Sequence, residues 1–219
     1  MDPMTHDPGD GSDGLTRAGV LRLLAGSAAA SAGLELLVAP GASAKTKTKT
    51  KTKAAAHRRE ITLLQYALSL EYLGAAFYQA ALHDLDLSDP TRTAAVALRA
   101  HERAHAQFVR AQIIELGGKP HPAEKFTFDK ALATEASFLK TSARIEELCV
   151  ETLNGATALV KSPVLGALAE IASVEARHAA WIRSLAGQKP APVASTPAIS
   201  TGASKTAFNK LHLTKEKFR

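Results

Sequence analysis

The sequence predicts an all-α protein whose centre is a four-helix bundle. Proline and glycine gather before about residue 55 and after about residue 186, whereas the residues between are rich in alanine, leucine, glutamate and arginine, which favour helix. Alternation typical of strands is nearly absent there. Two copies of Glu-x-x-His, Glu102-Arg-Ala-His105 and Glu175-Ala-Arg-His178, lie in two of the helical stretches. Composition, periodicity and motif together indicate one helical domain over residues 57–187.

The first predicted helix covers residues 57–83. Apolar residues recur there at three- and four-residue spacing, which is typical of a helix with one buried face. Glu71 lies at the centre of this apolar stripe, where a carboxylate without a partner is costly to bury. Tyr78 lies two turns further along the same face. It can pack in the core, donate a hydrogen bond to a buried group or act as a redox-active phenol.

The second predicted helix covers residues 90–116. Asp89 is a suitable N-cap, Pro90 suits the first helical position, and two glycines follow residue 116. Glu102 and His105 share one face because residues three apart on a helix lie one above the other. The flanking apolar residues indicate that this face is buried. His101 lies off the centre of the face, so it is either a surface residue or a neighbour of the buried groups.

The third predicted helix covers residues 129–160, and the sequence does not decide which of its glutamates is buried. Glu146 lies nearest to the apolar stripe and is our first choice, and Glu147 is the second. A third possibility is that these two and Glu151 are all surface charges. Cys149 lies in the stripe, so we expect a core thiol, and as the only cysteine it excludes an intrachain disulfide.

The fourth predicted helix covers residues 163–186, carries Glu175 and His178 on its apolar face, and ends at Gly187. The connection over residues 117–128 is the longest of the three between helices, so we expect it to contain the crossover between two helical hairpins. The result is an up-down-down-up bundle. Each hairpin then offers a helix with one glutamate, followed by a helix with Glu-x-x-His.

This order of residues is that of the di-iron carboxylate bundles. Residues 57–187 resemble the ferritin-like superfamily, which includes bacterioferritin and rubrerythrin, and more closely the exported ferritin-like proteins related to plant desiccation-related proteins. The resemblance implies that Glu71 and Glu146 are bridging or terminal carboxylates. It implies that the other ligands are Glu102 with His105 and Glu175 with His178. It also implies two iron ions per chain, or manganese in their place, that react with dioxygen or peroxide.

The chemistry of these side chains favours the same metals. Four carboxylates and two imidazoles supply hard oxygen and borderline nitrogen donors, which suit iron or manganese, and no cysteine competes to favour zinc or copper. Four carboxylates also balance the charge of two divalent ions. Without metal, the buried carboxylates would repel one another and their pKa values would rise. We therefore expect metal to stabilise the fold.

Residues 1–44 resemble an export signal. Arg17 and Arg22 precede a short apolar run over residues 23–34, and Ala42-Ser43-Ala44 is a small-x-small cleavage site. The run is too short to span a bilayer. Residues 16–22 resemble the twin-arginine signal, with alanine and valine in place of the second arginine and the aromatic residue, and the general secretory route also remains open. The alternative is a disordered, alanine-rich leader on a cytoplasmic protein.

The segments on either side of the bundle are expected to be disordered. Residues 45–56 contain five alternating lysines, Lys45 to Lys53, which repel one another, and threonine favours helix poorly. This segment is a flexible linker or a tether to an anionic partner such as cell-envelope polymer. Nucleic acid is a less favoured partner because no aromatic residue is present there to stack on bases. Residues 188–206 are predicted to be a second linker, and the basic residues 208–219 either dock on the bundle or remain loose.

The sequence is compatible with two functions. The first is an exported ferritin-like di-metal protein with ferroxidase or peroxide-scavenging activity, in iron handling or in protection against oxidative or desiccation stress. The second is a structural or envelope-binding helical module whose metal only stabilises it or is absent. An oligomer is possible, although long segments at both ends argue against a mineral-storing cage.

Overall fold

The computed structural model describes residues 42–160 and 164–214, with side chains from residue 54 onward. Residues from Thr46 onward belong to one compact unit. The described helices are α2 (Ala42–Asp84), α3 (Asp89–Glu115), α4 (Glu135–Thr157), α5 (Val164–Leu185) and α6 (Thr201–Asn209). Over these ranges no strand is present, apart from an isolated bridge between Phe126 and Thr214. The prediction of an all-α fold is confirmed.

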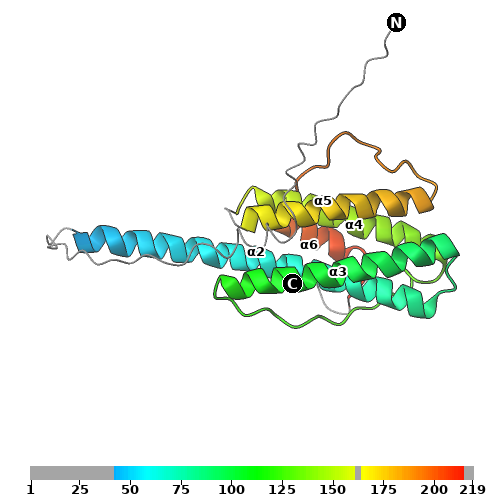
Figure 1. The fold of residues 1–219 in the computed structure, drawn as a ribbon, viewed down its shortest axis with the longest axis horizontal. Coiled ribbons are helices and arrows are strands. Elements are labelled where there is room, and N and C mark those ends of the chain that lie inside the picture. Colours follow the sequence, from blue (N-terminus) through cyan, green and yellow to red (C-terminus); the bar gives the residue numbers. More distant parts are fainter. Residues whose placement is uncertain (1–41, 161–163, 215–219) are drawn as a thin grey trace, which may run out of the picture. The chain divides into compact units, whose positions relative to one another are not determined.

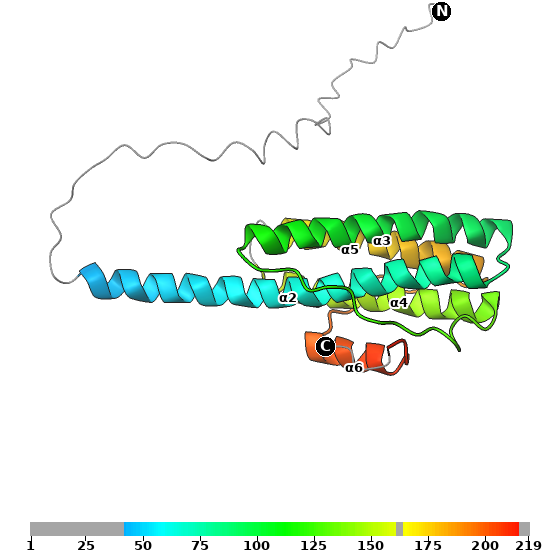
Figure 2. The same cartoon turned by 90° about the horizontal axis from the view of Figure 1, so that it is seen from below.

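The four long helices form the expected up-down-down-up bundle (Figures 1 and 2). A short turn joins α2 to the antiparallel α3, and α5 runs antiparallel to α4. The long connection between α3 and α4 returns along the bundle, so these two helices run in the same direction. The starts of α3 and α4 are accordingly close, because the backbone N–H of Ser88 donates to Glu135 Oε2 over 2.9 Å and the Ser88 hydroxyl donates to Glu135 Oε1 over 2.6 Å.

Local capping sets the ends of the helices. Gly117 has a φ of +80° beyond the end of α3, a conformation that glycine adopts without strain. The prediction that the third helix starts at residue 129 was wrong, because residues 129–134 form turns and α4 begins at Glu135. Thr134 and Ser137 form a capping box there: the Ser137 N–H donates to Thr134 Oγ1 over 3.1 Å, and the Thr134 N–H donates to Ser137 Oγ over 2.9 Å.

Two apolar clusters fill the bundle on either side of its middle. One includes Phe77, Tyr78 and Phe138 toward the turn between α2 and α3, and the other includes Leu64 and Ile113 toward the opposite end. Cys149 is buried and free in the first cluster, which confirms the expected core thiol. Between the clusters the inward positions of the four helices carry polar side chains. The candidate site therefore lies in the middle of the rods, with apolar packing above and below it.

The segment after α5 ends in a docked helix, so the prediction of a disordered C-terminal tail was wrong for residues 201–214. Residues 188–200 are irregular and mostly exposed, as expected of a linker, and of the two alternatives for residues 208–219 the structure shows docking, as far as residue 214. The docked helix is α6, whose Phe208 is buried against the first apolar cluster. Ser204 Oγ lies 2.8 Å from the Tyr66 hydroxyl of α2 and 2.5 Å from Thr152 Oγ1 of α4. Figure 2 shows α6 beside α4. A short helix between proline- and serine-rich stretches has too little periodicity to be recognised from the sequence.

Before the bundle, α2 begins at Ala42 and therefore includes the lysine and threonine run, where a linker was expected. Lysine has a high helix propensity, and extending a helix that is already nucleated costs little. Apart from its last three residues, the leader predicted over residues 1–44 lies outside the described residues. None of the helices that the structure describes combines the length and the apolar character needed to cross a membrane.

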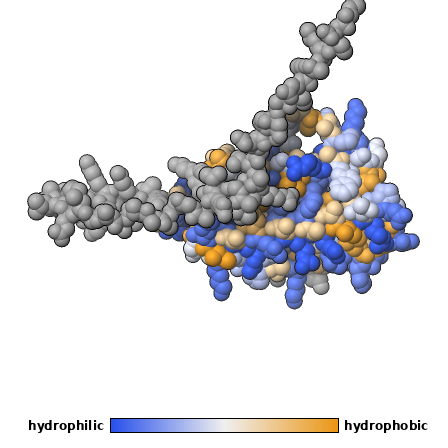
Figure 3. Space-filling model, viewed as in Figure 1, coloured by the Kyte–Doolittle hydropathy of each residue, from blue (hydrophilic) through white to orange (hydrophobic). Residues whose placement is uncertain are grey.

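The surface of the bundle mixes hydrophobic and hydrophilic side chains. On the face drawn in Figure 3, hydrophobic and hydrophilic residues are interspersed. The large apolar residues that are exposed, such as Phe108 on α3 and Trp181 on α5, come from these two helices and from the segments that follow α4 and α5. Single exposed apolar residues are normal for a folded protein.

Candidate metal centre

Each bundle helix contributes to one buried polar cluster in the middle of the rods. Glu71 comes from α2, Glu146 from α4, and each of the other two helices adds a glutamate and a histidine. The structure brings together all six residues that the sequence analysis singled out. The four glutamates and His178 are at most 3% exposed, and the His105 side chain is 12% exposed. The six residues are Glu71, Glu102, His105, Glu146, Glu175 and His178.

The choice among the glutamates of α4 follows from their surroundings. Glu146 is fully buried and faces the cluster. Glu147 and Glu151 instead pair with arginines: Arg144 Nη1 lies 3.3 Å from a carboxylate oxygen of each, and Arg183 Nε donates to Glu147 over 2.9 Å. Of these three glutamates, only Glu146 therefore faces the interior of the bundle.

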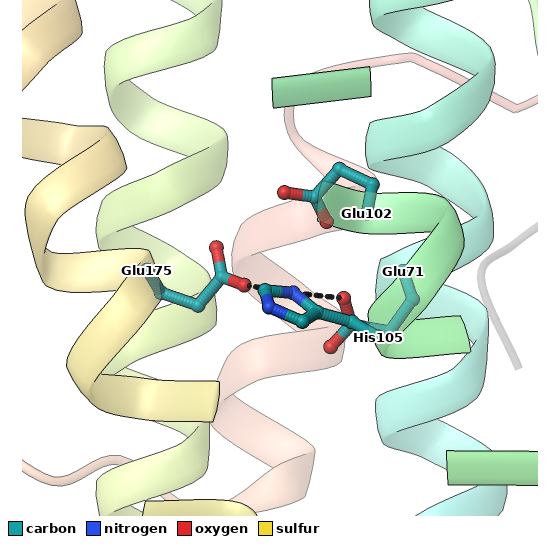
Figure 4. Close-up of side chains that lie close together, drawn as sticks. All are labelled: Glu71, Glu102, His105 and Glu175. Carbon is teal, nitrogen blue, oxygen red and sulfur yellow. Dashed lines mark ion pairs between the residues drawn. The ribbon is translucent and has the colours of Figure 1, made fainter. Parts of the chain in front are cut away.

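The two imidazoles lie among the carboxylates. His105 Nδ1 is 2.8 Å from Glu175 Oε1 and 3.3 Å from Glu71 Oε2 (Figure 4). His178 Nδ1 is 3.2 Å from Glu102 Oε1, 3.4 Å from Glu146 Oε2 and 3.3 Å from Glu175 Oε2. Each Nδ1 therefore faces two or three carboxylates from different helices at once.

The atoms that face one another in this way have no hydrogen-bond partner of suitable geometry. They include Nδ1 of both histidines, both oxygens of Glu175 and one oxygen of each other glutamate. Leaving one buried polar atom unsatisfied costs about 1–3 kcal/mol, and more for a charged group. Converging unsatisfied oxygen and nitrogen donors are what a cation needs. The donor chemistry and the geometry therefore fit a metal centre.

The donors form two overlapping groups, within each of which the ligand atoms all lie within 4.8 Å of one another. One group is Glu71, Glu102, His105 and Glu175, and the other is Glu102, Glu146, Glu175 and His178. Glu102 and Glu175 belong to both. These two glutamates, which stand first in the Glu-x-x-His copies, are therefore shared by the two groups and could be shared by two ions, whereas Glu71 and Glu146 each belong to a single group.

The profile of the ferritin-like domain family matches residues 59–188, which is more than half of the chain. The chain belongs to this family. The matched segment of this ferritin-like protein contains all six cluster residues and stops before α6, so the docked C-terminal segment lies outside the match. No curated protein matches the chain.

The electrostatics of the metal-free cluster follow from burial. Burial, followed by repulsion from neighbouring carboxylates, raises the pKa values of Glu71, Glu102 and Glu146 well above the ordinary range. Burial also acts to raise the pKa of Glu175, but contacts with both histidines outweigh it and hold that pKa below its ordinary value. Despite burial, contacts with the glutamates raise the pKa of His178 to about 12 and also raise that of His105. The cluster therefore holds protons that cations would displace.

Two further side chains contact the cluster from outside. The fully buried Tyr78 donates its hydroxyl proton to Glu146 Oε1 and leaves Oε2 facing the cluster. Nδ1 of the exposed His101 lies 2.9 Å from Nε2 of His178, and the two rings stack at 11°. Such outer contacts hold ligands in position and fix which imidazole nitrogen faces an ion.

The sequence left the roles of these two residues open. Tyr78 combines two of the possibilities, because it is a core residue and also a hydrogen-bond donor to a buried group. His101 is both exposed and a neighbour of the cluster. Its place directly before Glu102 was the available signal, but only the packing of α3 against α5 shows which side chain it contacts.

Proposed function

We propose that this ferritin-like protein binds two metal ions between its four helices, iron by preference and manganese as the alternative, and reacts them with dioxygen or peroxide. The observation that carries the proposal is the convergence of buried donors without hydrogen-bond partners into two groups that share two glutamates. Bound iron would supply one-electron chemistry toward an oxidant, which no side chain of the cluster supplies. The same donors without redox chemistry would make a purely structural centre.

The protein's own contribution is position and shielding. Glu102 and Glu175 lie where a carboxylate can be shared, and Glu71, His105, Glu146 and His178 complete the two groups. The apolar clusters above and below keep bulk water out, so each charge interaction within the cluster is stronger than it would be in solvent. Tyr78 and His101 hold two of the ligands from outside.

Anaerobic loading with iron(II), followed by exposure to air, tests the proposal. We expect about two iron ions per chain by elemental analysis and a new absorption band after oxidation. The Glu102→Gln/Glu175→Gln variant should lose both, because each group loses two charged carboxylate donors. Glu151→Gln is the control, since Glu151 pairs with Arg144 instead of facing the cluster. A wild-type chain that folds fully, binds no iron and gives no band would instead support the structural or envelope-binding module.

The proposed location is outside the cytoplasm, which is also where the exported, desiccation-related proteins that the sequence resembles would act. The support is the order of residues 1–44: arginines, then a short apolar run, then Ala42-Ser43-Ala44. Expression of the full chain in a bacterium, with fractionation and mass analysis of the N-terminus, tests this. Cleavage after Ala44 is expected, and an intact chain confined to the cytoplasm would contradict export without affecting the metal proposal.

The lysine run beginning at Lys45 would then be available to an anionic polymer of the cell envelope. Retention on a teichoic-acid-like polyphosphate resin, lost as salt is raised, is the expected behaviour. Replacement of the five lysines by glutamine should abolish it.

A further inference from the structure

Gly74 lies inside α2, three residues after Glu71, where alanine would favour helix more strongly than glycine. Its φ is not positive, so the backbone conformation does not require glycine. The reason for a glycine at this position must therefore lie in what surrounds it.

The space beside Gly74 is occupied by a cluster residue on another helix. A Cβ built on Gly74 would lie 2.8 Å from Glu102 Oε2 and 3.0 Å from both Cδ and Cγ of Glu102. A Cβ atom, which cannot hydrogen-bond, is essentially never found within 3.0 Å of another heavy atom, so one of the two groups would have to move. The group that can move is the Glu102 side chain, because its χ angles are free to change whereas Gly74 is fixed in the helix backbone.

Glu102 has little room to move without leaving the cluster. It is 2% exposed, its Oε1 lies 3.2 Å from His178 Nδ1, and it belongs to both donor groups. The Glu102 side chain thus lies between the bare backbone of α2 on one side and the imidazole on the other. A displacement away from α2 would change its distance to every other donor.

We propose that Gly74 is a positioning residue for the metal centre: its missing side chain leaves the space in which Glu102 lies so that both ion positions share the Glu102 carboxylate. This rests on the proposed function for the role of Glu102 as a ligand. A methyl group at position 74 displaces the carboxylate and weakens both ion positions together. The fold survives, since the displaced group is a flexible side chain and alanine favours helix.

Gly166 provides a matched control. It lies in the first turn of another bundle helix, α5, and apart from its chain neighbours and the backbone of its own helix no described atom lies within 4 Å of a Cβ built on it. Gly74→Ala and Gly166→Ala therefore make the same change of residue in the same kind of element. They differ in whether the new methyl group meets a cluster residue.

In the first experiment the full-length protein is titrated with cobalt(II) alone. The heat of binding and the visible absorption spectrum of the bound ion are both recorded. Gly74→Ala should lower the affinity of both ions by about 10–100-fold, as loss of ligand support does, whereas Gly166→Ala should leave it at the wild-type value. Wild-type affinity and an unchanged cobalt spectrum for Gly74→Ala would overturn the proposal.

The second experiment needs no metal and separates this proposal from the proposed function. Thermal unfolding of metal-free protein is compared for Gly74→Ala with Glu102 intact and in a Glu102→Ala background. Once Glu102 is removed, Gly74→Ala should raise the midpoint as Gly166→Ala does, and with Glu102 present it should raise it less or lower it. Equal effects in the two backgrounds would overturn the steric basis, even if wild-type protein binds two ions. A wild-type chain that binds no cobalt but shows this coupling would contradict the proposed function and leave the steric relation intact.

Discussion

The candidate metal centre has two halves, one with Glu146 and His178 and one with Glu71 and His105, which share Glu102 and Glu175. The halves contain the same residue types but are held differently by the protein around them. In one half Tyr78 donates to Glu146, and His101 contacts His178, whose side chain is only 3% exposed. In the other half the His105 side chain is 12% exposed. Among the described residues, Glu71 and His105 make no hydrogen bond or ion pair outside the six-residue cluster.

The two helical hairpins repeat one pattern, a helix with a glutamate followed by a helix with Glu-x-x-His. The difference between the halves comes from two positions at which the hairpins do not match. Tyr78 follows Glu71 by seven residues, and the equivalent position after Glu146 is Leu153, which has no hydroxyl group. His101 directly precedes Glu102, and the equivalent position before Glu175 is Val174, which cannot hydrogen-bond. The repeated motif places similar donors in both halves, while unrepeated residues decide which half is held rigidly. We therefore expect the half with Glu146 and His178 to bind its ion more tightly.

The largest effect is expected where the two halves are joined. Glu175→Gln removes a charged donor from both groups, so both halves should be weakened and the difference in affinity between them should be lost. We expect loss of both ions in a cobalt(II) titration, at least about a 100-fold fall in affinity, since loss of a ligand exceeds loss of ligand support. Glu147→Gln changes a glutamate that pairs with Arg183 outside the cluster and should keep both ions. Retention of one full-affinity ion in Glu175→Gln would show that the halves are independent.

Removal of the outer contacts should affect one half alone. Tyr78→Phe keeps the ring in the apolar cluster and removes only the donor to Glu146, and His101→Ala removes the contact to His178. Each should weaken one of the two ions by about 10–100-fold and leave the other unchanged. Stepwise calorimetric titration measures the two affinities separately. Equal weakening of both ions would mean that the outer contacts act on the cluster as a whole.

A smaller effect, in the opposite direction, is expected from restoring the repeat. Val174 precedes Glu175 as His101 precedes Glu102, and it is partly exposed. Val174→His would offer His105 the outer partner that it lacks. We expect the weaker ion to bind about 2–10-fold more tightly, less than the loss seen on removing an optimised contact. Val174→Leu is the control for added bulk, and the same gain there would contradict the role of the hydrogen bond.

The sequence predicted those parts of the molecule that repeat with a helical period. The stripes of α3 and α5 located both helices closely, and angular position on the third helix favoured Glu146 over Glu147. The contacts of Gly74 with Glu102 and of His101 with His178 could not be predicted, because each joins two helices whose relative rotation is set only by packing. The helix α6 was not predicted, and its docking was left open, for a related reason: its main polar contact is between Ser204, Tyr66 and Thr152, three residues with no recognisable spacing.

The smallest effect, a few degrees in the unfolding midpoint, concerns a property that the two halves should share. The pKa values of Glu71 and Glu146 are raised above 4.5, so over the window above this value the folded metal-free chain holds protons that the unfolded chain has lost. The raised pKa values of both histidines act the same way above 6.5, whereas the lowered pKa of Glu175 matters only as pH falls below 4.5. Metal-free stability should therefore fall as pH rises from about 6 to 9, and Glu71→Gln and Glu146→Gln should flatten this slope equally. Calorimetry in chelator-treated buffer checks this. If only one of the two variants flattens the slope, the halves differ in proton binding as well as in metal binding.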